Sequence, residues 1–379
     1  MTDRLLERFD PSVVDPADGE WRVRLEVRDA ESQDVLAGPD GARVAGERGH
    51  ADARLNADAP TWNAIERDVR GGMEAFQAGR LKVRRNLHAG VSFLAATSGV
   101  TGEARLRFAS VTARPGRLSY LQAGTGPPVV AIHGLGATKA SMLPTVAALA
   151  PDFRMIALDL PGFGESGKPL GAAYDARFFA DSVVELLDAL GIERAHFVGN
   201  SLGGRVALEL GLRHADRAER LALLAPSMAW RRSRPWAPLL RLLPPELGAL
   251  QPTPGAVRGI VDRVIPGAAD GWTAAGVDEF MRSYLTPHGR AAFYAAARQI
   301  YLEEPHGEHG FWPRLRTLRA PALFVWGRQD RLVPLGFARH VTDALPTAEH
   351  LELDCGHVPQ LERPRQTHAA LRAFLRRSP

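Results

Sequence analysis

Three residues in the second half of the chain have the types and surroundings that nucleophilic catalysis needs. Ser201 is the central residue of Gly-Asn-Ser-Leu-Gly-Gly, which follows an apolar segment and precedes a helical one. A serine hydroxyl is a weak nucleophile at neutral pH and needs an adjacent base, which an acid holds in the correct tautomer. Asp330 and His357 each follow a predicted strand and suit the acid and the base. The three residues predict acyl transfer through Ser201.

The glycines around Ser201 predict a sharp turn from a strand into a helix. The serine backbone is strained in such a turn, and glycines two positions before and two after it let the strand and the helix approach. The turn also points the N-terminus of the new helix at the reacting carbonyl group. The alternative is an ordinary glycine-rich turn without chemistry.

A second predicted loop supplies hydrogen-bond donors to the negatively charged oxygen that forms during acyl transfer. An apolar segment that starts at Val129 runs into His-Gly-Leu-Gly at residues 133–136. We predict the backbone amides of Leu135 and Leu202 as the donors to the oxyanion. The ring of His133 is expected to fix this loop, although contact with substrate stays open. The predicted substrate contacts are His133, Gly134, Asn200, Trp230 and Trp236.

Other acids and histidines compete less well for these roles. Asp354 lies only three residues before His357, and so local a pair would constrain the loop severely. Asp159 is expected to organise a turn at the end of a strand, and His306 and His309 are expected on a solvated surface. No group of histidine, cysteine and acidic residues has a convincing metal-ligand spacing, so we predict neither a metal nor another cofactor.

The elements that must position these residues begin near Leu106, where strands start to alternate with helices. That order indicates a mostly parallel sheet covered on both faces. Residues 174–190 form a predicted helix that ends before Gly191. The interval 226–318 is too long for a loop in a compact core, so we predict a lid there. The predicted strands lie near residues 117–122, 129–133, 155–159, 196–200, 221–224, 322–326 and 350–353.

The predicted lid has an apolar character that favours a hydrophobic acyl or aromatic group in the substrate. Most of these side chains should pack the lid against the sheet. They are Met228, Trp230, Trp236, Leu239, Leu240, Leu242, Leu243 and Trp272.

Residues 1 to about 100 follow another pattern and predict a separate α+β domain. Alternation over residues 21–27 indicates a strand. Apolar residues at helical spacing from Trp62 to Phe76 predict one helix, which Gly79 closes in a left-handed conformation. The segment 81–93 again has the alternation of a strand. Residues 99–105 form a plausible linker to a second domain at 101–379.

Composition excludes several other classes of protein. The chain has 379 residues, 45% of them hydrophobic, with a formal net charge of +4. The basic residues are scattered, and nucleic-acid binding would need them clustered on one face. No apolar run reaches the roughly 18 to 20 residues of a transmembrane helix. Cys355 is the only cysteine, so no intrachain disulfide can form, and we expect a soluble, cytoplasmic protein.

The ordered set of motifs resembles the α/β-hydrolase superfamily over residues 106–379. It consists of His-Gly-Leu-Gly, Asp-Leu-Pro-Gly-Phe-Gly-Glu-Ser, Gly-Asn-Ser-Leu-Gly-Gly, Gly-Arg-Gln-Asp-Arg-Leu-Val-Pro and Gly-His-Val-Pro-Gln. The resemblance implies an α/β fold with an eight-stranded sheet, helices on both faces, a helical cap and hydrolysis without a cofactor. It does not fix the substrate, because many activities share this fold.

Three functions follow from the nucleophile and its surroundings. Serine, rather than the aspartate of haloalkane dehalogenases and epoxide hydrolases, favours carboxylic esters with a hydrophobic acyl or alcohol group. The Gly-Asn-Ser-x-Gly-Gly variant also looks like the carbon-carbon bond hydrolases of aromatic ring-cleavage products. Those enzymes usually carry a Gly-Pro-Gly-like loop where this chain has Gly134-Leu-Gly, which ranks this function second. The third, from another class, is a non-catalytic protein that binds a lipid or another ligand.

Residues 5–98 resemble the sterol carrier protein family of lipid-binding domains. The similarity rests on Thr61-Trp-Asn-Ala-Ile65 and on the segment from Glu74 to Val83. That family commonly has a glycine shortly after the lysine that corresponds to Lys82, and this chain has Arg85. The resemblance implies a lipid as a ligand of this domain, and the alternative is an accessory domain with a closed core.

Overall fold

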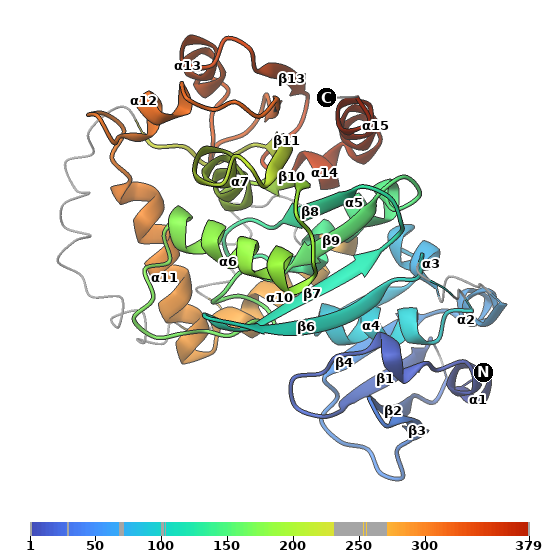
Figure 1. Ribbon diagram of the computed structural model, residues 1–379. Helices are drawn as coiled ribbons and strands as arrows, with labels where there is room; N and C mark the ends of the chain where they lie inside the picture. Colours follow the sequence, from blue (N-terminus) through green and yellow to red (C-terminus); the bar gives the residue numbers. More distant parts are fainter. Residues whose placement is uncertain are drawn as a thin grey trace. The chain divides into compact units, whose positions relative to one another are not determined.

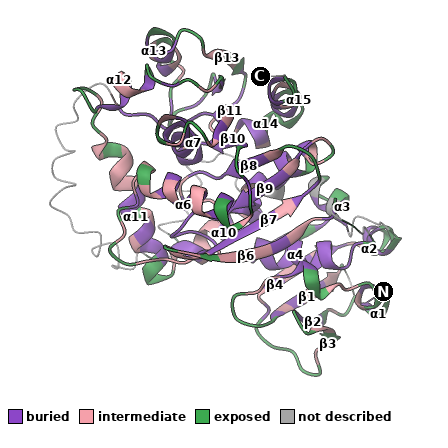
Figure 2. Cartoon of the chain, viewed as in Figure 1, coloured by how far each residue is buried: buried purple, intermediate pink, exposed green. Residues whose placement is uncertain are grey.

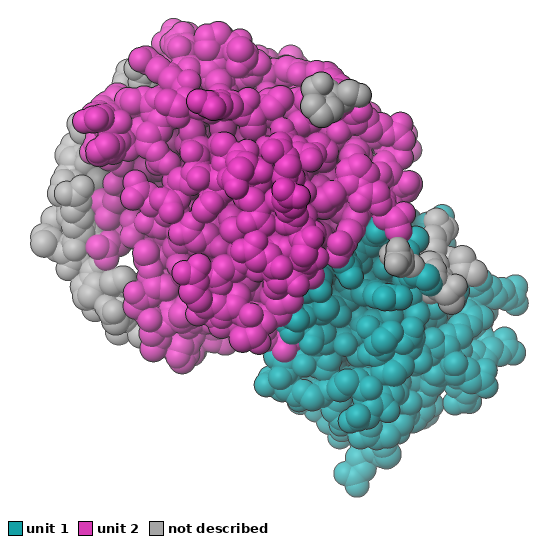
Figure 3. Space-filling model, viewed as in Figure 1, with its two compact units in different colours: residues 1–110, 120–124, 252–285 teal, residues 111–119, 125–251, 286–379 magenta. Residues whose placement is uncertain are grey.

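The computed structural model describes residues 2–28, 30–67, 72–99, 102, 104–230, 253, 255 and 271–377. The chain forms two compact units (Figure 3). The N-terminal unit comprises residues 1–110, 120–124 and 252–285, and the C-terminal unit comprises residues 111–119, 125–251 and 286–379. The N-terminal unit therefore extends past the predicted boundary near residue 100 and includes part of the predicted lid.

An eight-stranded sheet carries the predicted site residues, in the order β13-β12-β11-β10-β8-β9-β7-β6. From β8 to β13 all neighbouring strands pair in parallel. The seven strands expected from the sequence are present, and β6 is an eighth that the sequence pattern did not predict. The strands are β6 (Arg107–Ala113), β7 (Gly116–Ala123), β8 (Pro128–Ile132), β9 (Arg154–Leu158), β10 (Ala195–Asn200), β11 (Ala218–Leu224), β12 (Ala322–Gly327) and β13 (Glu349–Leu353).

Helices cover both faces of this sheet (Figure 1). Helix α6 (Ala176–Ala189) packs against α7 (Leu202–Arg213), and α5 (Leu143–Leu149) packs with α15 (Pro364–Leu375). The predicted helix over residues 174–190 is confirmed as α6, whose first turn is capped by Asp175. Between these layers the strands β8 and β10 are almost wholly buried (Figure 2). All residues of β12 are also buried. Shorter helices are η2 (Lys139–Met142), α13 (Phe337–Ala344) and α14 (Pro359–Glu362).

The N-terminal unit has its own five-stranded sheet, in the order β3-β2-β1-β4-β5. Helix α4 (Leu87–Ala96) packs on β1, β4 and β5, and all ten of its residues are buried. Strand β1 (Trp21–Val27) has the bounds that the alternation predicted. The other elements are α1 (Thr2–Glu7), η1 (Pro11–Val13), β2 (Gln33–Gly38), β3 (Gly41–Val44), β4 (Ala53–Ala57), α2 (Ala59–Arg67), α3 (Met73–Gln77) and β5 (Lys82–Arg85).

Two local predictions in this unit were wrong. The segment 81–93 is a strand only as far as Arg85, because Asn86 then caps helix α4 by accepting a hydrogen bond from the amide of Ala89 at 2.9 Å. The single helix expected between Trp62 and Phe76 is two helices, α2 and α3, and Gly72 precedes α3 in a left-handed conformation with φ 82°. Gly79 has φ 73°, as the predicted C-cap requires.

Part of the predicted lid belongs to the N-terminal unit. Helix α10 (Gly271–Tyr284) packs on β5 and α4. Asp278 accepts hydrogen bonds from Arg84 at 2.6 and 2.9 Å, and the buried Glu279 accepts one from the amide of Leu87 at 3.1 Å. Helices α11 (Pro287–Leu302) and α12 (Phe311–Leu315) belong to the C-terminal unit. In the described parts of the chain, no helix combines the length and apolarity needed to cross a bilayer.

Candidate active site

Ser201 occupies a strained turn between β10 and α7. Its backbone has φ 54° and ψ −114°, a conformation with positive φ that is uncommon for a residue with a side chain. Hydrogen bonds on both sides hold this conformation. The Ser201 amide donates to the carbonyl oxygen of Leu224 at 2.9 Å, and its own carbonyl accepts from the amides of Arg205 and Ser227. The predicted strand-turn-helix geometry is therefore present.

The neighbouring glycines are needed because the backbone passes too close for any side chain. A Cβ atom on Gly199 would lie 2.2 Å from the carbonyl oxygen of Gly203. One on Gly203 would lie 2.1 Å from the carbonyl oxygen of Ile132, in the next strand. A Cβ atom added to Gly134 would lie 3.3 Å from Cβ of Ser201, so the loop after β8 lies directly beside the serine.

Asp330 and His357 meet at the ends of β12 and β13. Nδ1 of His357 lies 2.8 Å from Oδ2 of Asp330, and the Asp330 side chain has no exposed surface. The other carboxylate oxygen accepts from the amides of Leu332 and Val333 at 2.8 and 2.9 Å, which fixes its orientation. Because a carboxylate only accepts, Nδ1 carries the hydrogen, and Nε2 is the nitrogen able to take up a proton.

Asn200 connects the histidine loop to the strand that precedes Ser201. Its Nδ2 donates to the carbonyl oxygens of Leu224 at 3.0 Å and of His357 at 3.1 Å. Asn200 is 4% exposed, so these bonds are largely shielded from water. Asn200 was predicted as a substrate contact, and in the structure it has a positioning role. Its hydrogen bond holds the backbone of His357 close to Asn200 itself, the residue directly before Ser201.

Comparisons with known proteins identify the family of this chain. The family described as the alpha/beta hydrolase fold matches residues 127–253. A 2-hydroxymuconate semialdehyde hydrolase from Pseudomonas sp. (strain CF600) is 31% identical over 274 residues, which span 68% of this chain and 88% of the relative. This chain belongs to the α/β-hydrolase family.

Two solved structures of the family have similar folds. An enol-lactonase from Burkholderia xenovorans LB400 has a TM-score of 0.60 and 25% identity, over 71% of this chain and all of the other. A bacterial membrane phospholipase A has a TM-score of 0.57 and 31% identity, over 71% of this chain and 86% of the other. The α/β-hydrolase fold expected for the C-terminal part is confirmed.

In this α/β-hydrolase the ring of His133 holds the loop after β8 by hydrogen bonds. Nε2 of His133 accepts from the amide of Leu160 at 3.0 Å, so Nδ1 carries the hydrogen and donates to the carbonyl oxygen of Gly134 at 2.7 Å. Burial lowers the pKa of His133, an effect that the carboxylate of Asp159 only partly offsets, so the ring is neutral. The ring has no exposed surface, and its observed contacts fix the loop.

The two predicted oxyanion donors lie in two different segments near Ser201, the loop after β8 and the start of α7. Leu135 follows Gly134, which is in contact with the serine. Leu202 is the first residue of α7, where an amide has no acceptor within its own helix. Both positions suit the predicted role of donating to a negatively charged oxygen.

A buried ion pair organises the turn after β9. Asp159 accepts from the Lys139 amide at 2.7 Å, from Nζ of the same residue at 2.5 Å and from the amide of Glu165 at 2.9 Å. Burial tends to raise the pKa of Asp159, but the charge and hydrogen bonds of Lys139 outweigh it and the pKa is lowered. The turn role expected for Asp159 is thus its role in the structure. The partner Lys139 was not predicted, because no local signal links residues 20 positions apart.

The sequence analysis also named an alternative acid, two tryptophans and two histidines. Asp354, the alternative acid, is exposed and accepts from Gln329 at 2.8 Å. The ring of Trp230 packs edge-on against Phe337 with centroids 5.1 Å apart, and Trp236 is outside the described residues. His306 and His309 are exposed, as expected.

Cys355, two residues before His357, is 2% exposed. Burial and the nearby carboxylate of Glu362 raise the pKa of its thiol to about 11. The side chain is therefore a protonated packing group at neutral pH rather than a second nucleophile.

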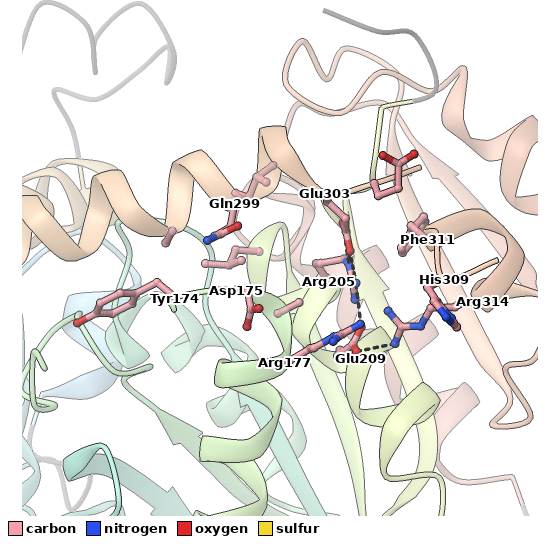
Figure 4. Close-up of a pocket in the computed structure, with 15 residues that line it drawn as sticks. Tyr174, Asp175, Arg177, Arg205, Glu209, Gln299, Glu303, His309, Phe311 and Arg314 are labelled. Atoms are coloured by element: carbon pink, nitrogen blue, oxygen red, sulfur yellow. Dashed lines mark hydrogen bonds and ion pairs between the residues drawn. The ribbon is translucent and has the colours of Figure 1, made fainter. Parts of the chain in front are cut away.

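A group of four charged residues near Ser201 was missed by the sequence analysis. Arg205 and Glu209 are buried in α7, and they pair with Glu303 and Arg314 (Figure 4). The spacing of Arg205 and Glu209 on one face of an otherwise apolar helix was a usable signal. Their partners, 98 and 105 residues away, have no signal in the sequence.

Proposed function

We propose that this α/β-hydrolase uses Ser201 as a nucleophile, His357 as the general base and Asp330 as the acid that orients the imidazole. The observation that carries the proposal is the hydrogen bond between Nδ1 of His357 and Oδ2 of Asp330, on a loop that Asn200 ties to the serine turn. It keeps a hydrogen on Nδ1 of His357, so Nε2 is the nitrogen that can accept the proton of the serine hydroxyl.

The proposed reaction has two halves. Oγ of Ser201 attacks the carbonyl carbon while Nε2 of His357 takes up the hydroxyl proton, and the amides of Leu135 and Leu202 donate to the resulting oxyanion. The leaving group then departs with that proton and leaves an acyl-enzyme on Ser201. A water molecule, deprotonated by His357, attacks the acyl carbon, and Ser201 regains its proton as the acid product leaves.

As substrate class we favour products of aromatic ring cleavage, in which a carbon-carbon bond next to a carbonyl group is hydrolysed. The relative from Pseudomonas sp. is named for 2-hydroxymuconate semialdehyde, a molecule without an ester or amide bond, so its hydrolysis must break a bond between carbons. The Gly-Asn-Ser-x-Gly-Gly motif supports the same class. The leaving group is then a carbon atom, which receives the proton from His357.

Ester hydrolysis is the second candidate. It is supported by the similarity to a membrane phospholipase A and by the apolar residues Met228 and Trp230 at the start of the predicted lid. Such residues favour a hydrophobic acyl or alcohol group. The same acyl-enzyme would form, with an alcohol rather than a carbon as the leaving group.

One experiment separates these classes. Wild type, Ser201→Ala and the control Ser182→Ala, a buried serine of α6, are assayed with 2-hydroxymuconate semialdehyde and with p-nitrophenyl esters of increasing chain length. We expect turnover of the ring-cleavage product at least tenfold above the best ester in wild type and the control, and none with Ser201→Ala. Faster turnover of an ester would establish the second candidate. Failure of a fluorophosphonate to label Ser201 would favour a non-catalytic ligand-binding protein.

For the N-terminal unit we propose a sterol-carrier-like fold with a closed core around α4. At Arg85, where that family commonly has glycine, the backbone keeps a left-handed conformation with φ 72°, which glycine adopts most easily. A Cβ atom on Gly90 of α4 would lie 2.4 Å from Cγ1 of Val83, so this face has no room for a lipid. Saturable binding of a fluorescent fatty acid by the full chain, displaced by sterol, would contradict the closed core.

We also propose a cytoplasmic location. The single, buried Cys355 needs no oxidising compartment. Fractionation of the cells that make the protein, with immunodetection, tests it.

A further inference from the structure

Four charged side chains form a continuous network along one wall of a pocket in the C-terminal unit (Figure 4). Nε of Arg205 donates to the two carboxylate oxygens of Glu303 at 2.9 and 3.0 Å, and its Nη2 donates to Glu303 and to Glu209, the latter at 2.8 Å. The other oxygen of Glu209 accepts from Arg314 at 2.5 Å. The network contains two positive and two negative charges and is therefore neutral.

The network joins the helix that begins at Ser201 to the end of the predicted lid. Arg205 is one turn into α7, and its amide donates to the carbonyl oxygen of Ser201 at 3.1 Å. Glu303 is the C-cap of α11, and Arg314 lies in α12. Two elements of the inserted segment are thus attached to the nucleophile helix within the same compact unit.

The centre of the network is shielded from water. Arg205 is 3% exposed and Glu209 has no exposed surface. Burial alone would lower the pKa of the Arg205 guanidinium, but Glu303 and Glu209 outweigh burial and raise it. Burial would likewise raise the pKa of Glu209, but Arg205 and Arg314 lower it. Arg205 and Glu209 are therefore charged at neutral pH, and their pairing is strong because little water screens it.

The pocket beside the network reaches the residue after the nucleophile. It has a volume of about 210 Å³, and its lining includes Leu202, Arg205 and Phe311. The ring of Phe311 lies under the Arg205 guanidinium at 4.8 Å and limits its movement. A displacement of Arg205 would therefore be transmitted along the first turn of α7 to Leu202 and Ser201.

We propose that Arg205 is a positioning residue for the proposed reaction: by holding α11 and α12 to α7, it keeps Ser201 and the Leu202 amide in the geometry for attack. This role rests on the proposed function of Ser201. It requires no contact between Arg205 and substrate, so its loss changes the chemical step and leaves substrate binding nearly unaltered.

The test compares Arg205→Met with Arg213→Met, a change in the same helix. Arg213 pairs with Asp181 at 3.4 Å on the surface, and both side chains are more than one third exposed. The measurements are kcat and KM for the better substrate in the panel above and the rate constant of Ser201 labelling by a fluorophosphonate. For Arg205→Met we expect kcat and the labelling rate to fall at least tenfold, with KM changed less than twofold. Arg213→Met should match wild type.

Two further variants keep the test decisive if Arg205→Met does not fold. Arg205→Lys retains the charge but lacks the planar guanidinium, whose Nε and Nη2 both donate to Glu303 while Nη2 also donates to Glu209, so an intermediate loss of kcat is expected. Arg205→Met combined with Glu303→Met removes both charges of the central pair, and we expect the same loss of kcat in folded protein. Wild-type kcat and labelling rate in a folded single or double variant, or a rise in KM alone, would overturn the positioning role. Absence of labelling in wild type would instead overturn the proposed function.

Discussion

At the scale of single residues, the site depends on which carboxylate holds the histidine. Asp330 is buried and accepts two backbone hydrogen bonds besides the one from His357, whereas Asp354 is exposed and bound to Gln329. Only a carboxylate with fixed geometry can keep the hydrogen on Nδ1 of the imidazole. The structure therefore favours Asp330 as the orienting acid over its close neighbour in the sequence.

The first prediction compares these two acids. We expect Asp330→Asn to lower kcat by about 10³ to 10⁴-fold, because the amide can donate to Nδ1 and favour the wrong tautomer. Asp354→Asn, the matched control, should keep kcat within about threefold, a loss of less than 1 kcal/mol of transition-state stabilisation. Circular dichroism would show whether both variants are folded. A larger loss with Asp354→Asn than with Asp330→Asn would reverse the assignment.

The positions of single residues could be predicted from the sequence where a local pattern surrounds them. Ser201 has glycines at fixed distances, and Asp330 and His357 follow strands in a fixed order. Arg205 and Lys139 were missed because their partners, Glu303 and Asp159, come close only after folding. The neighbouring sequence has no signal that Lys139 is buried, whereas the spacing of Arg205 and Glu209 in an apolar helix was a signal that could have been used.

At the scale of elements, helix α4 shows how tightly the N-terminal unit is packed. It contains Gly90, whose Cβ position is only 2.4 Å from Val83 Cγ1 and 3.2 Å from Leu55 Cδ2. Helix α10 contains Gly276, whose Cβ position has no atom within 4 Å. The two glycines form a matched pair in one unit, one required by packing and the other not.

The second prediction uses this pair. Gly90→Ala should lower the free energy of unfolding by about 1 to 3 kcal/mol, because the added methyl group overpacks a closed interface. Gly276→Ala should raise it by about 0.5 to 1 kcal/mol, because alanine loses less backbone entropy in a helix. Urea denaturation followed by circular dichroism measures both. A Gly90→Ala variant as stable as wild type would show that a cavity exists beside α4.

The third prediction concerns the contact between α5 and α15. His368 lies there with Nε2 3.2 Å from Oγ1 of Thr145, and burial together with Arg372 lowers the pKa of His368 to about 4. The His368 ring therefore binds a proton more readily in the unfolded chain than in the folded one. The contribution of the neutral ring to the free energy of unfolding is complete above about pH 6.5 and is lost as the pH falls toward 4.

His368→Gln removes this titration and tests the sign. Between pH 7 and pH 4.5 the wild type should lose about 2 to 3 kcal/mol more free energy of unfolding than the variant. Other buried histidines, such as His133, are the same in both proteins, so the difference isolates residue 368. Equal losses would mean that the His368 ring reaches water in the folded state.

The elements were predictable where periodicity was clear and not where burial was complete. Strand β1 and helix α6 have one polar face and were predicted nearly to the residue. Helix α4 is buried on all sides, so its apolar residues lack the period of a helix and were taken for a strand. The division between α2 and α3 depends on backbone geometry around Gly72, which residue spacing does not encode.

At the scale of the whole molecule, the two compact units do not follow the order of the chain. Residues 252–285 belong to the N-terminal unit, although they are inserted in the sequence of the α/β-hydrolase part. The contact between Arg84 and Asp278 joins residues 194 positions apart, which explains why a boundary near residue 100 was the natural expectation from the sequence. A pattern along the chain shows where strands and helices lie, but not which distant helix completes a unit.

The last prediction is that a chain of residues 101–379 will not behave as an independent domain. Its helix α10 would expose Ala274, Ala275 and Val277, which are at most 3% exposed in the whole protein, and would leave Glu279 without the Leu87 amide. Exposed apolar surface of this kind promotes association.

We expect the truncated chain to elute as aggregates in size-exclusion chromatography and to show a lower Tm than the full chain. The full-length control Arg84→Met, which loses only the salt bridge to Asp278, should elute at the volume of the full chain and show a smaller decrease in Tm. A monomeric 101–379 chain with the Tm of the full protein would show that α10 is stable without its partners in the N-terminal unit.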